Sequence, residues 1–292
     1  MLLDLLDRCR FPAPGTPVAC AVSGGADSMA LLALAIEAGC DVTAVHVDHG
    51  LRPGSAAEAD VVAAAAARFG AAFESRRSIV SPGPDLEARA RAARYAALPR
   101  GALTGHTADD QAETVLLNLL RGAGLDGLRG MNATNRPLLG LRRTETRALC
   151  DALALEVIDD PSNADPSIRR NRVRHELLPL LDAIAERDVV PIVTRQASLL
   201  ADEAAVLDDL AAALDPTDAH VLAAAPPALA RRAVRAWLRC GSDLEHHPPD
   251  AATVERVLAV ARGEAKGTDV GGGRRVTRSR GRLVLTVRSE EA

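Results

Sequence analysis

The stretch Ala19-Cys20-Ala21-Val22-Ser23-Gly24-Gly25-Ala26-Asp27-Ser28 decides the fold. Its small and apolar residues up to Val22 predict a buried strand, and the periodic apolar residues after it predict a helix. The glycine pair between them permits positive φ angles and close approach of the backbone to a ligand. Because the first amides of a helix have no intrahelical partner, they could bind a phosphate group together with Ser23 and Ser28. The stretch therefore predicts a strand, a phosphate-binding turn and a helix.

This turn differs from two well-known phosphate-binding loops. No Gly-Lys-Ser/Thr follows the glycines, so it is not a Walker A loop, and the glycine spacing of the dinucleotide-binding motif is absent. The alternative interpretation is an ordinary tight turn in which Asp27 caps the helix.

Apolar segments alternate with amphipathic ones through the first 160 residues, a pattern that is typical of a parallel sheet with helices on both faces. The fold class is therefore α/β with five parallel strands. The expected strands are Val18–Val22, Val42–Val47, Ala72–Ser75, Ala102–Thr104 and a weaker Leu155–Ile158, and the expected helices are Ser28–Ala38, Ala56–Phe69, Leu86–Leu98, Ala108–Arg121 and Glu145–Leu153.

After Pro161 the pattern becomes helical, and the chain ends in a predicted hairpin. We expect a large domain over residues 1–185, a helical linker over 186–215 and a small α+β domain over 216–292. The expected helices are Val173–Leu181, Val189–Leu214, Pro227–Arg239 and Ala251–Ala261, and the hairpin strands are Arg274–Ser279 and Arg282–Val287 around Gly281.

The composition excludes several classes of protein. Aromatic residues make up 2% of the 292 residues, which argues against a sheet that stacks bases on several rings, and the net charge of -4 argues against a uniformly basic chain. Five cysteines form no C-x-x-C pair or zinc spacing, which favours a reducing cytoplasm. We find neither an export signal nor an apolar run long enough for a membrane span.

A second polar stretch, Gly105-His106-Thr107-Ala108-Asp109-Asp110-Gln111-Ala112-Glu113-Thr114, follows the fourth predicted strand. Asp110 and Glu113 are three residues apart and therefore share one face of the helix. Because the carboxyl ends of parallel strands meet at one edge of a sheet, we expect these carboxylates to lie near the phosphate-binding turn. The alternative is a helix cap and an acidic first turn, which the helix dipole favours in any protein.

Two histidines and an aspartate lie at the end of the second predicted strand. His46, Asp48 and His49 lack the spacing of known zinc motifs, so a structural role or a contact with adenosine is favoured over a metal site.

Several ordered motifs resemble one family. Ser23 to Ser28 resembles the pyrophosphatase loop (PP-loop) of enzymes that split ATP into AMP and pyrophosphate, and the remaining motifs resemble the tRNA(Ile)-lysidine synthase family. These motifs are Val45–Arg52, the set Glu87, Arg89, Arg94 and Tyr95, Gly105–Thr114 with Asn118, Arg121, Gly122 and Gly124, then Arg136–Leu139, Asp160–Asn163 and Arg170–Pro179. The similarity covers most of residues 18–181 and is closest to a short form without the last C-terminal domain.

The resemblance implies a ligase of tRNA modification with an adenine nucleotide alpha-hydrolase-like fold. In this family ATP adenylates the wobble cytidine of the isoleucine tRNA with a CAU anticodon, and free L-lysine then displaces AMP. Residues 1–185 would form the PP-loop catalytic domain and residues 216–292 a tRNA-binding domain. ATP and Mg²⁺ are the implied cofactors. No protein partner is evident, and a homodimer stays open.

The resemblance also implies roles for single residues. Asp27, Asp110 and His106 would be catalytic, with Asp110 the candidate base and Asp27 a ligand of the ATP-bound Mg²⁺. Asp110 and Glu113 would bind lysine. Residues implied to bind ATP are Ser23, Gly24, Gly25, Ala26, Asp27 and Ser28.

Arginines are the candidate contacts for tRNA. The expected contacts are Arg121, Arg172, Arg174, Arg274 and Arg275. Residues 266–288 hold seven basic residues and one acid, so phosphate binding there would depend on salt. A solvated, arginine-rich hairpin face is the alternative.

Three other functions are the alternatives to this interpretation. A PP-loop tRNA thiolase needs a C-x-x-C pair or paired catalytic cysteines, which this sequence lacks. A small-molecule amidating enzyme couples the loop to a glutaminase domain, for which 292 residues leave no room. A non-catalytic tRNA-binding module would not need the intact set of Ser23, Asp27, Asp110 and Glu113.

Overall fold

The computed structural model describes residues 2–48, 55–78, 86–240 and 249–287, and the chain divides into two compact units, residues 1–198 and 199–292. His49 to Arg52 of the second-strand motif and Arg288 of the basic segment lie outside the described residues. Each unit is described separately below.

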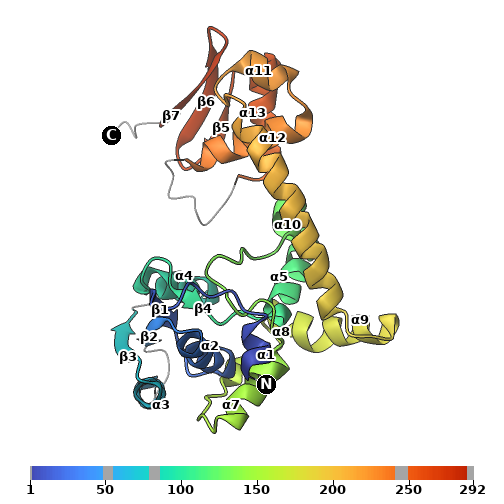
Figure 1. The fold of residues 1–292 in the computed structure, drawn as a ribbon. Coiled ribbons are helices and arrows are strands. Elements are labelled where there is room, and N and C mark those ends of the chain that lie inside the picture. Colours follow the sequence, from blue (N-terminus) through green and yellow to red (C-terminus); the bar gives the residue numbers. More distant parts are fainter. Residues whose placement is uncertain (1, 49–54, 79–85, 241–248, 288–292) are drawn as a thin grey trace. The chain divides into compact units, whose positions relative to one another are not determined.

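A parallel sheet of four strands forms the centre of the first unit, in the order β3-β2-β1-β4 (Figure 1). Its strands are β1 (Pro17–Ala21), β2 (Asp41–Asp48), β3 (Ala72–Arg77) and β4 (Leu103–Thr104). The predicted α/β class with a parallel sheet is confirmed.

The prediction of a fifth strand at Leu155–Ile158 is wrong. This segment is irregular, and the amide of Ile158 donates to the carbonyl of Gly24 at 3.0 Å instead of pairing with a strand. Its apolar residues pack beside the turn at Gly24 and the core, so they are partly buried without forming a strand. The apolar residues of Leu155–Ile158 therefore indicate packing against the core and not a strand.

Helices connect the strands and follow them. In chain order they are α1 (Leu2–Leu6), α2 (Ala26–Glu37), α3 (Ser55–Phe69), α4 (Leu86–Ala97), α5 (Ala108–Leu120), α6 (Leu125–Leu128), α7 (Arg143–Ala152), the 3₁₀ turn η1 (Pro161–Ala164), α8 (Arg169–Arg172), the π-helical turn η2 (Val173–Leu177) and α9 (Leu178–Ala185). The long helices follow the predicted ranges to within about two residues, while α6 and α8 were not predicted.

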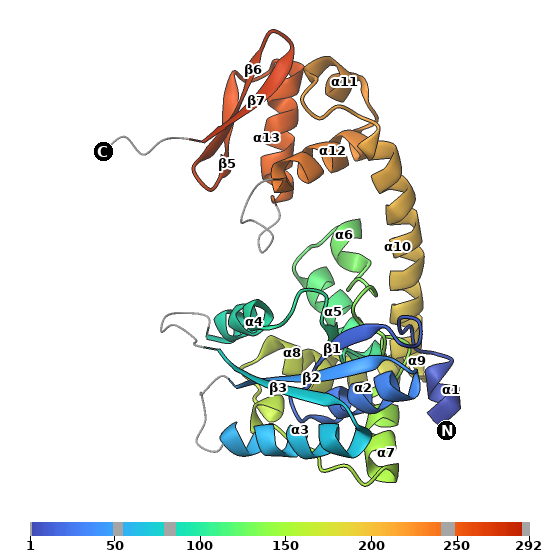
Figure 2. The ribbon, with the colours of Figure 1, turned by 60° about the vertical axis from the view of Figure 1, so that its left-hand side comes forward.

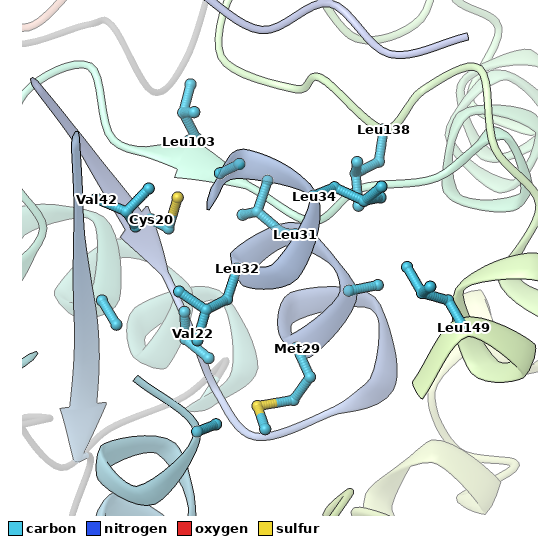
Figure 3. Packing of buried hydrophobic residues seen from close by; sticks show 14 of the residues in the cluster. Cys20, Val22, Met29, Leu31, Leu32, Leu34, Val42, Leu103, Leu138 and Leu149 are labelled. Carbon is cyan, nitrogen blue, oxygen red and sulfur yellow. The ribbon is translucent and has the colours of Figure 1, made fainter. Parts of the chain in front are cut away.

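The central strands β1 and β2 contribute to cores on both faces of the sheet, since alternate side chains of a strand point to opposite sides, whereas β3 is largely exposed. Cys20 and Val42 belong to the main core together with α2 and α3, whereas Ala21 and Val45 pack on the opposite face against Leu98, which follows α4. Figure 3 shows Leu31, Leu34 and Met29 of α2 in this main core, between the strands and the side chains of Leu138 and Leu149. The first residues of α2 are therefore held firmly at the edge of the sheet.

The second unit is a small α+β structure. Helix α10 (Val190–Ala212) leads into it, and α13 packs against its antiparallel sheet (Figure 2). The remaining elements are α11 (Ala219–Ala224), α12 (Pro227–Arg239), α13 (Ala251–Arg262), β5 (Gly267–Gly271), β6 (Arg274–Ser279) and β7 (Arg282–Val287). The predicted hairpin is confirmed, with Arg280 and Gly281 at positive φ in its turn. Strand β5, which contains two glycines and an aspartate, was not predicted.

Among the helices in the described ranges, none has both the length and the apolar character that a membrane crossing requires.

Candidate functional site

The site lies where the order of the strands reverses. The chain continues from β1 to β2 on one side of the sheet, and β4 pairs with the other side of β1. In open parallel sheets, ligands bind outside the carboxyl ends of the strands at such a switch point. The glycine turn follows β1 and the acidic stretch follows β4, and a Cβ added to Gly105 would lie 2.6 Å from the Asp27 carbonyl oxygen. The predicted closeness of the two stretches is therefore confirmed.

Polar groups within the glycine turn form hydrogen bonds with one another. Ser28 Oγ donates to the carbonyl of Gly25 at 2.8 Å and accepts the amide of Ser23 at 3.1 Å. The first hydrogen bonds of α2 run from the amides of Ser28 and Met29 to Gly25. The amides of Ala26 and Asp27 precede them, so the turn has the geometry of an anion site at a helix N-terminus.

Gly24 carries the tightest constraint in this turn. Its φ is +87°, and a Cβ at this position would lie 2.3 Å from Cδ1 of Ile158. We expect Gly24→Ala to lower stability by about 1–3 kcal/mol through strain and to weaken ATP binding about tenfold or more, because the turn must shift. Denaturant unfolding and ATP titration measure the two effects.

Gly70 is a control that has the backbone strain of a positive φ without a side chain close to the added Cβ. Gly70 also has a positive φ, of +71°, but nothing lies within 4 Å of an added Cβ. Gly70→Ala should therefore reproduce the loss of stability without the loss of ATP affinity. Equal ATP affinity in both variants would show that the shape of the Gly24 turn does not matter for the nucleotide.

His46 holds the start of the glycine turn. Its side chain is buried, and Nδ1 lies 3.0 Å from the carbonyl oxygen of Val22, which fixes Nδ1 as the donor. The ring thus extends the pairing of β1 and β2 by one hydrogen bond. This contact supports the structural role that the sequence favoured for His46.

Asp110 is buried and uses one carboxylate oxygen for a structural contact and the other for ion pairs in the site. Its Oδ2 accepts from the amide of Thr107 at 2.9 Å and from the Thr107 hydroxyl at 3.1 Å, which caps α5. Its Oδ1 faces Arg143 at 2.9 Å and Arg170 at 3.0 Å. Both interpretations of the acidic stretch therefore apply to Asp110, one to each oxygen.

Glu113 is completely buried beneath three guanidinium groups. It accepts from Nε of Arg170 at 2.6 Å, from Nε of Arg174 at 2.7 Å and from Arg143 at 3.2 Å. Arg170 and Arg174 are four residues apart in continuous helical structure, so both reach the same carboxylate. Arg174, a predicted tRNA contact, lies in this cluster with Arg170, for which a tRNA or phosphate contact was also expected, whereas Arg143 had no predicted role.

Arg143 joins the two stretches. Its Nε lies 3.4 Å from Oδ2 of Asp27, while its other nitrogens contact Asp110 and Glu113. Thr146, one turn later on α7, donates its hydroxyl to Oδ1 of Asp27. The carboxylate of the glycine turn and the carboxylates of α5 therefore share one guanidinium.

The pKa values of Asp27 and Asp110 shift in opposite directions, because burial outweighs the nearby charges at one and not at the other. Burial raises the pKa of Asp27 above its usual value, and the Thr146 hydrogen bond and the Arg143 charge only partly offset this. Burial acts on Asp110 too, but the charges of Arg143 and Arg170 outweigh it and lower the pKa of Asp110. Asp110 is thus a weak proton acceptor while these arginines remain in contact.

A signal in the sequence could have identified Arg143. Arg142 and Arg143 begin α7, where the helix dipole disfavours positive charge, so a pair of arginines there needs acidic partners. Asp109 supplies one, since it accepts from the Arg143 amide at 2.8 Å and from Arg142 at 3.0 Å. Arg142 also contacts Asp188, which ties α7 to the segment before α10.

The other predicted residues of the first unit lie around this cluster. His106 Nδ1 is 2.8 Å from the hydroxyl of Thr104, and its charge contributes to the lowered pKa of Asp110. Arg121 is exposed at the end of α5, and Arg172 is exposed and paired with Glu176 at 2.8 Å. Arg121 and Arg172 are therefore on the surface, unlike Arg174.

The second unit places its two predicted tRNA contacts differently. Arg274 is buried, 8% exposed, and donates to the carbonyl of Leu238 at 3.0 Å, so its guanidinium lies inside the unit rather than on a face open to tRNA. Arg275 points the other way and pairs with Asp269 at 3.0 Å. Arg282 pairs with Asp215 at 2.8 Å, which neutralises part of the basic excess.

The fit of this site to Mg²⁺ rests on one carboxylate. Within the described ranges, no group of three or more His, Cys, Asp or Glu residues could hold a metal ion. Asp27 offers a carboxylate beside the phosphate-binding turn, and Mg²⁺ commonly uses one or two carboxylates together with phosphate oxygens. The residues present fit a magnesium ion that arrives with a nucleotide.

Comparison with known proteins identifies both units. Residues 5–181 match the PP-loop domain family, and residues 218–284 match the TilS substrate binding domain. In the solved structures, the U34-tRNA thiolase of Methanococcus maripaludis is similar, with a TM-score of 0.55 over 68% of this chain and 77% of that chain. At 18% identity this likeness shows the fold alone.

Curated relatives are similar over nearly the whole chain. The tRNA(Ile)-lysidine synthase of Nocardia farcinica is 44% identical over 94% of this chain and 93% of its own length. That of Rhodococcus erythropolis is 41% identical over 93% and 90%, and that of Salinispora tropica 44% over 94% and 91%. Because the similarity includes the phosphate-binding turn, the acidic helix and the second unit alike, the chain belongs to the tRNA(Ile)-lysidine synthase family.

Proposed function

We propose that this protein uses ATP to join free L-lysine to C2 of the wobble cytidine in the isoleucine tRNA with a CAU anticodon. The observation that carries the proposal is the shared guanidinium of Arg143, which brings a nucleotide-binding turn and a pair of carboxylates into one site. The reaction needs both parts of the site, since the turn binds the ATP that activates the cytidine and the carboxylates bind the amine that attacks it. Family membership supports the same reaction.

In the first step, the O2 atom of cytidine attacks the α-phosphorus of ATP, and pyrophosphate leaves. Ser23, Ser28 and the amides from Gly24 to Asp27 are assigned to the phosphates, because helix N-termini and glycine turns stabilise anions. Asp27 would hold Mg²⁺, which when bound supplies positive charge to the leaving pyrophosphate. The resulting phosphate ester turns a poor electrophile into one with AMP as leaving group.

In the second step, the ε-amine of lysine attacks C2, the C2–N bond forms, and AMP departs with the O2 oxygen. We assign Asp110 and Glu113 to the lysine ammonium, because their carboxylates lie together at the sheet edge. An unperturbed lysine has a pKa of about 10.4, so a proton must leave before attack. Asp110 is the proposed acceptor once one of the arginines that lower its pKa has given way to the substrate, with His106 beside it.

The products give a direct test of the proposed reaction. The purified protein should release AMP and pyrophosphate in equal amounts when the tRNA transcript, lysine and ATP are all present, and neither product without the transcript. Release of ADP, or release that does not depend on tRNA, would contradict the proposal. Adding a sulfur donor in place of lysine separates it from tRNA thiolation, for which the sequence offers no C-x-x-C pair.

Arg275 is the proposed phosphate contact of the second unit. Arg275→Gln should weaken tRNA binding and reduce the slope of log affinity against log salt by about 0.7–0.9, the value for one lost phosphate contact. The measurement is tRNA binding at several salt concentrations. Arg231→Gln is the matched control, since Arg231 is an exposed, ion-paired arginine on α12 of the same unit. Equal slopes for both variants would rule out a specific contact at Arg275.

A further inference from the structure

Among the described residues, the guanidinium groups of three arginines contact Asp110 and Glu113, the carboxylates assigned to lysine. One of these groups also contacts Asp27 in the glycine turn, which forms the nucleotide half of the site. Arg170 and Arg174 contact Asp110 and Glu113 alone among the three site carboxylates, whereas Arg143 also contacts Asp27. The formal charges of the three arginines and three carboxylates cancel. A lysine ammonium can therefore enter only if one guanidinium gives up its contacts, because an added buried charge needs a partner.

The distances to Glu113 and Asp27 indicate that Arg143 gives way, whereas on Asp110 its contact, at 2.9 Å, is as short as that of Arg170, at 3.0 Å. On Glu113, the nitrogens of Arg170 and Arg174 lie at 2.6 and 2.7 Å, while that of Arg143 lies at 3.2 Å. The contact of Arg143 with Asp27 is longer still, at 3.4 Å. The side chain of Arg143 is 28% exposed, compared with 25% for Arg170 and 21% for Arg174. The backbone of Arg143 stays fixed, because its amide donates to Asp109 at 2.8 Å.

We propose that Arg143 makes lysine binding depend on the nucleotide: without ATP its guanidinium occupies the carboxylates assigned to lysine, and bound ATP draws it to the phosphate side. This inference rests on the proposed assignment of ATP to the glycine turn and of lysine to Asp110 and Glu113. Arg143 acts through these groups and is therefore a positioning residue.

The physical reason is the charge that ATP brings. A triphosphate carries several negative charges and would lie beside Asp27, within reach of a side chain that already contacts Asp27. A turn of the Arg143 side chain toward the phosphates leaves Asp110 and Glu113 short of one positive charge. The lysine ammonium supplies this charge, so each ligand favours the binding of the other, and the coupling is reciprocal.

The test is lysine titration calorimetry with and without a non-hydrolysable ATP analogue and Mg²⁺. For the native sequence we expect lysine to bind about tenfold more tightly when the analogue is present, within the usual range of such couplings. Arg143→Gln should bring this ratio close to one, because lysine then binds the free protein without displacing Arg143. Arg143→Lys keeps the charge but contacts fewer carboxylates, and should give an intermediate ratio.

Two matched arginines serve as controls. Arg174→Gln should alter lysine affinity but keep its dependence on the analogue, since Arg174 does not contact Asp27. Arg147→Gln, on the exposed face of α7, should leave both quantities unchanged. A merely structural role for Arg143 would weaken both ligands and leave the ratio as it was.

The calorimetric result and the transfer of lysine to tRNA can fail independently, so the two experiments test this inference and the proposed function separately. A native protein without coupling, or an Arg143→Gln variant that keeps it, would overturn the role of Arg143 even if lysine is transferred to tRNA. Coupling that disappears in Arg143→Gln would support the role even if no transfer occurred, and the failed transfer would then contradict the proposed function alone.

Discussion

Asp27→Asn is expected to abolish most pyrophosphate release, by about two to three orders of magnitude, while the variant melts at the same temperature as the native protein or higher. The loss of activity follows from removing the carboxylate that is proposed to hold Mg²⁺ at the leaving group, a contribution of the size seen for single electrostatic contacts in active sites. Pyrophosphate release and thermal melting measure the two effects on the same sample.

The expected gain in stability follows from the raised pKa of Asp27. Burial disfavours the ionised form, so at neutral pH the native carboxylate lowers the stability of the folded state. Asparagine removes this charge and keeps an oxygen that accepts from Thr146, while Arg143 keeps Asp110 and Glu113 as partners.

The raised pKa of Asp27 also determines how the stability difference between the variant and the native protein changes with pH. As the pH falls through the raised folded pKa toward the usual value of 3.8, the native carboxyl takes up a proton and the penalty disappears. The stability advantage of Asp27→Asn should therefore be present near neutral pH and vanish in acid. A variant whose melting temperature falls together with its activity would instead assign Asp27 to the structure of the helix start.

Glu113→Ala is expected to damage both the fold and lysine binding. The carboxylate is completely buried and accepts from Arg170, Arg174 and Arg143. Its removal leaves Asp110 as the remaining shared partner of three guanidinium groups. This excess of positive charge should cost about 3–5 kcal/mol of stability. Denaturant unfolding checks this value, and a cost below about 1 kcal/mol would contradict the described cluster.

A charge-balanced variant isolates the effect on lysine. The double variant Glu113→Gln with Arg174→Gln removes one charge of each sign and keeps the volume of the buried side chain at position 113. We expect it to raise the KM for lysine more than tenfold and the KM for ATP much less, because neither residue contacts the nucleotide half. Equal changes in both KM values would contradict the division of the site into two halves.

The features that the sequence predicts best are those determined by local chemistry. A buried strand followed by two glycines and a helix start specifies the phosphate-binding turn, and the spacing of Asp110 and Glu113 places both on one helix face. Strand order then brings them together, since β4 pairs with β1. These elements need no information about distant side chains.

The features that the sequence did not predict depend on contacts between distant segments. Ile158 follows an apolar run that resembles a strand, but it packs on Gly24, 134 positions earlier in the chain. The pair Arg142 and Arg143 at the start of α7 indicates a need for acidic partners, but this local pattern does not identify Asp27 and Asp110 as partners of Arg143. For Arg274 a local signal existed, because it shares a strand face with the buried Val276, and the high arginine content concealed it.

Transfer of labelled lysine to tRNA tests the central claim most directly. The native protein, incubated with ATP, Mg²⁺ and the isoleucine tRNA transcript with a CAU anticodon, should place the label on the wobble cytidine. The same transcript with uridine at that position should stay unlabelled. ATP-dependent label at the wobble cytidine would support the account, and its absence from a folded protein that binds both ATP and the transcript would contradict it.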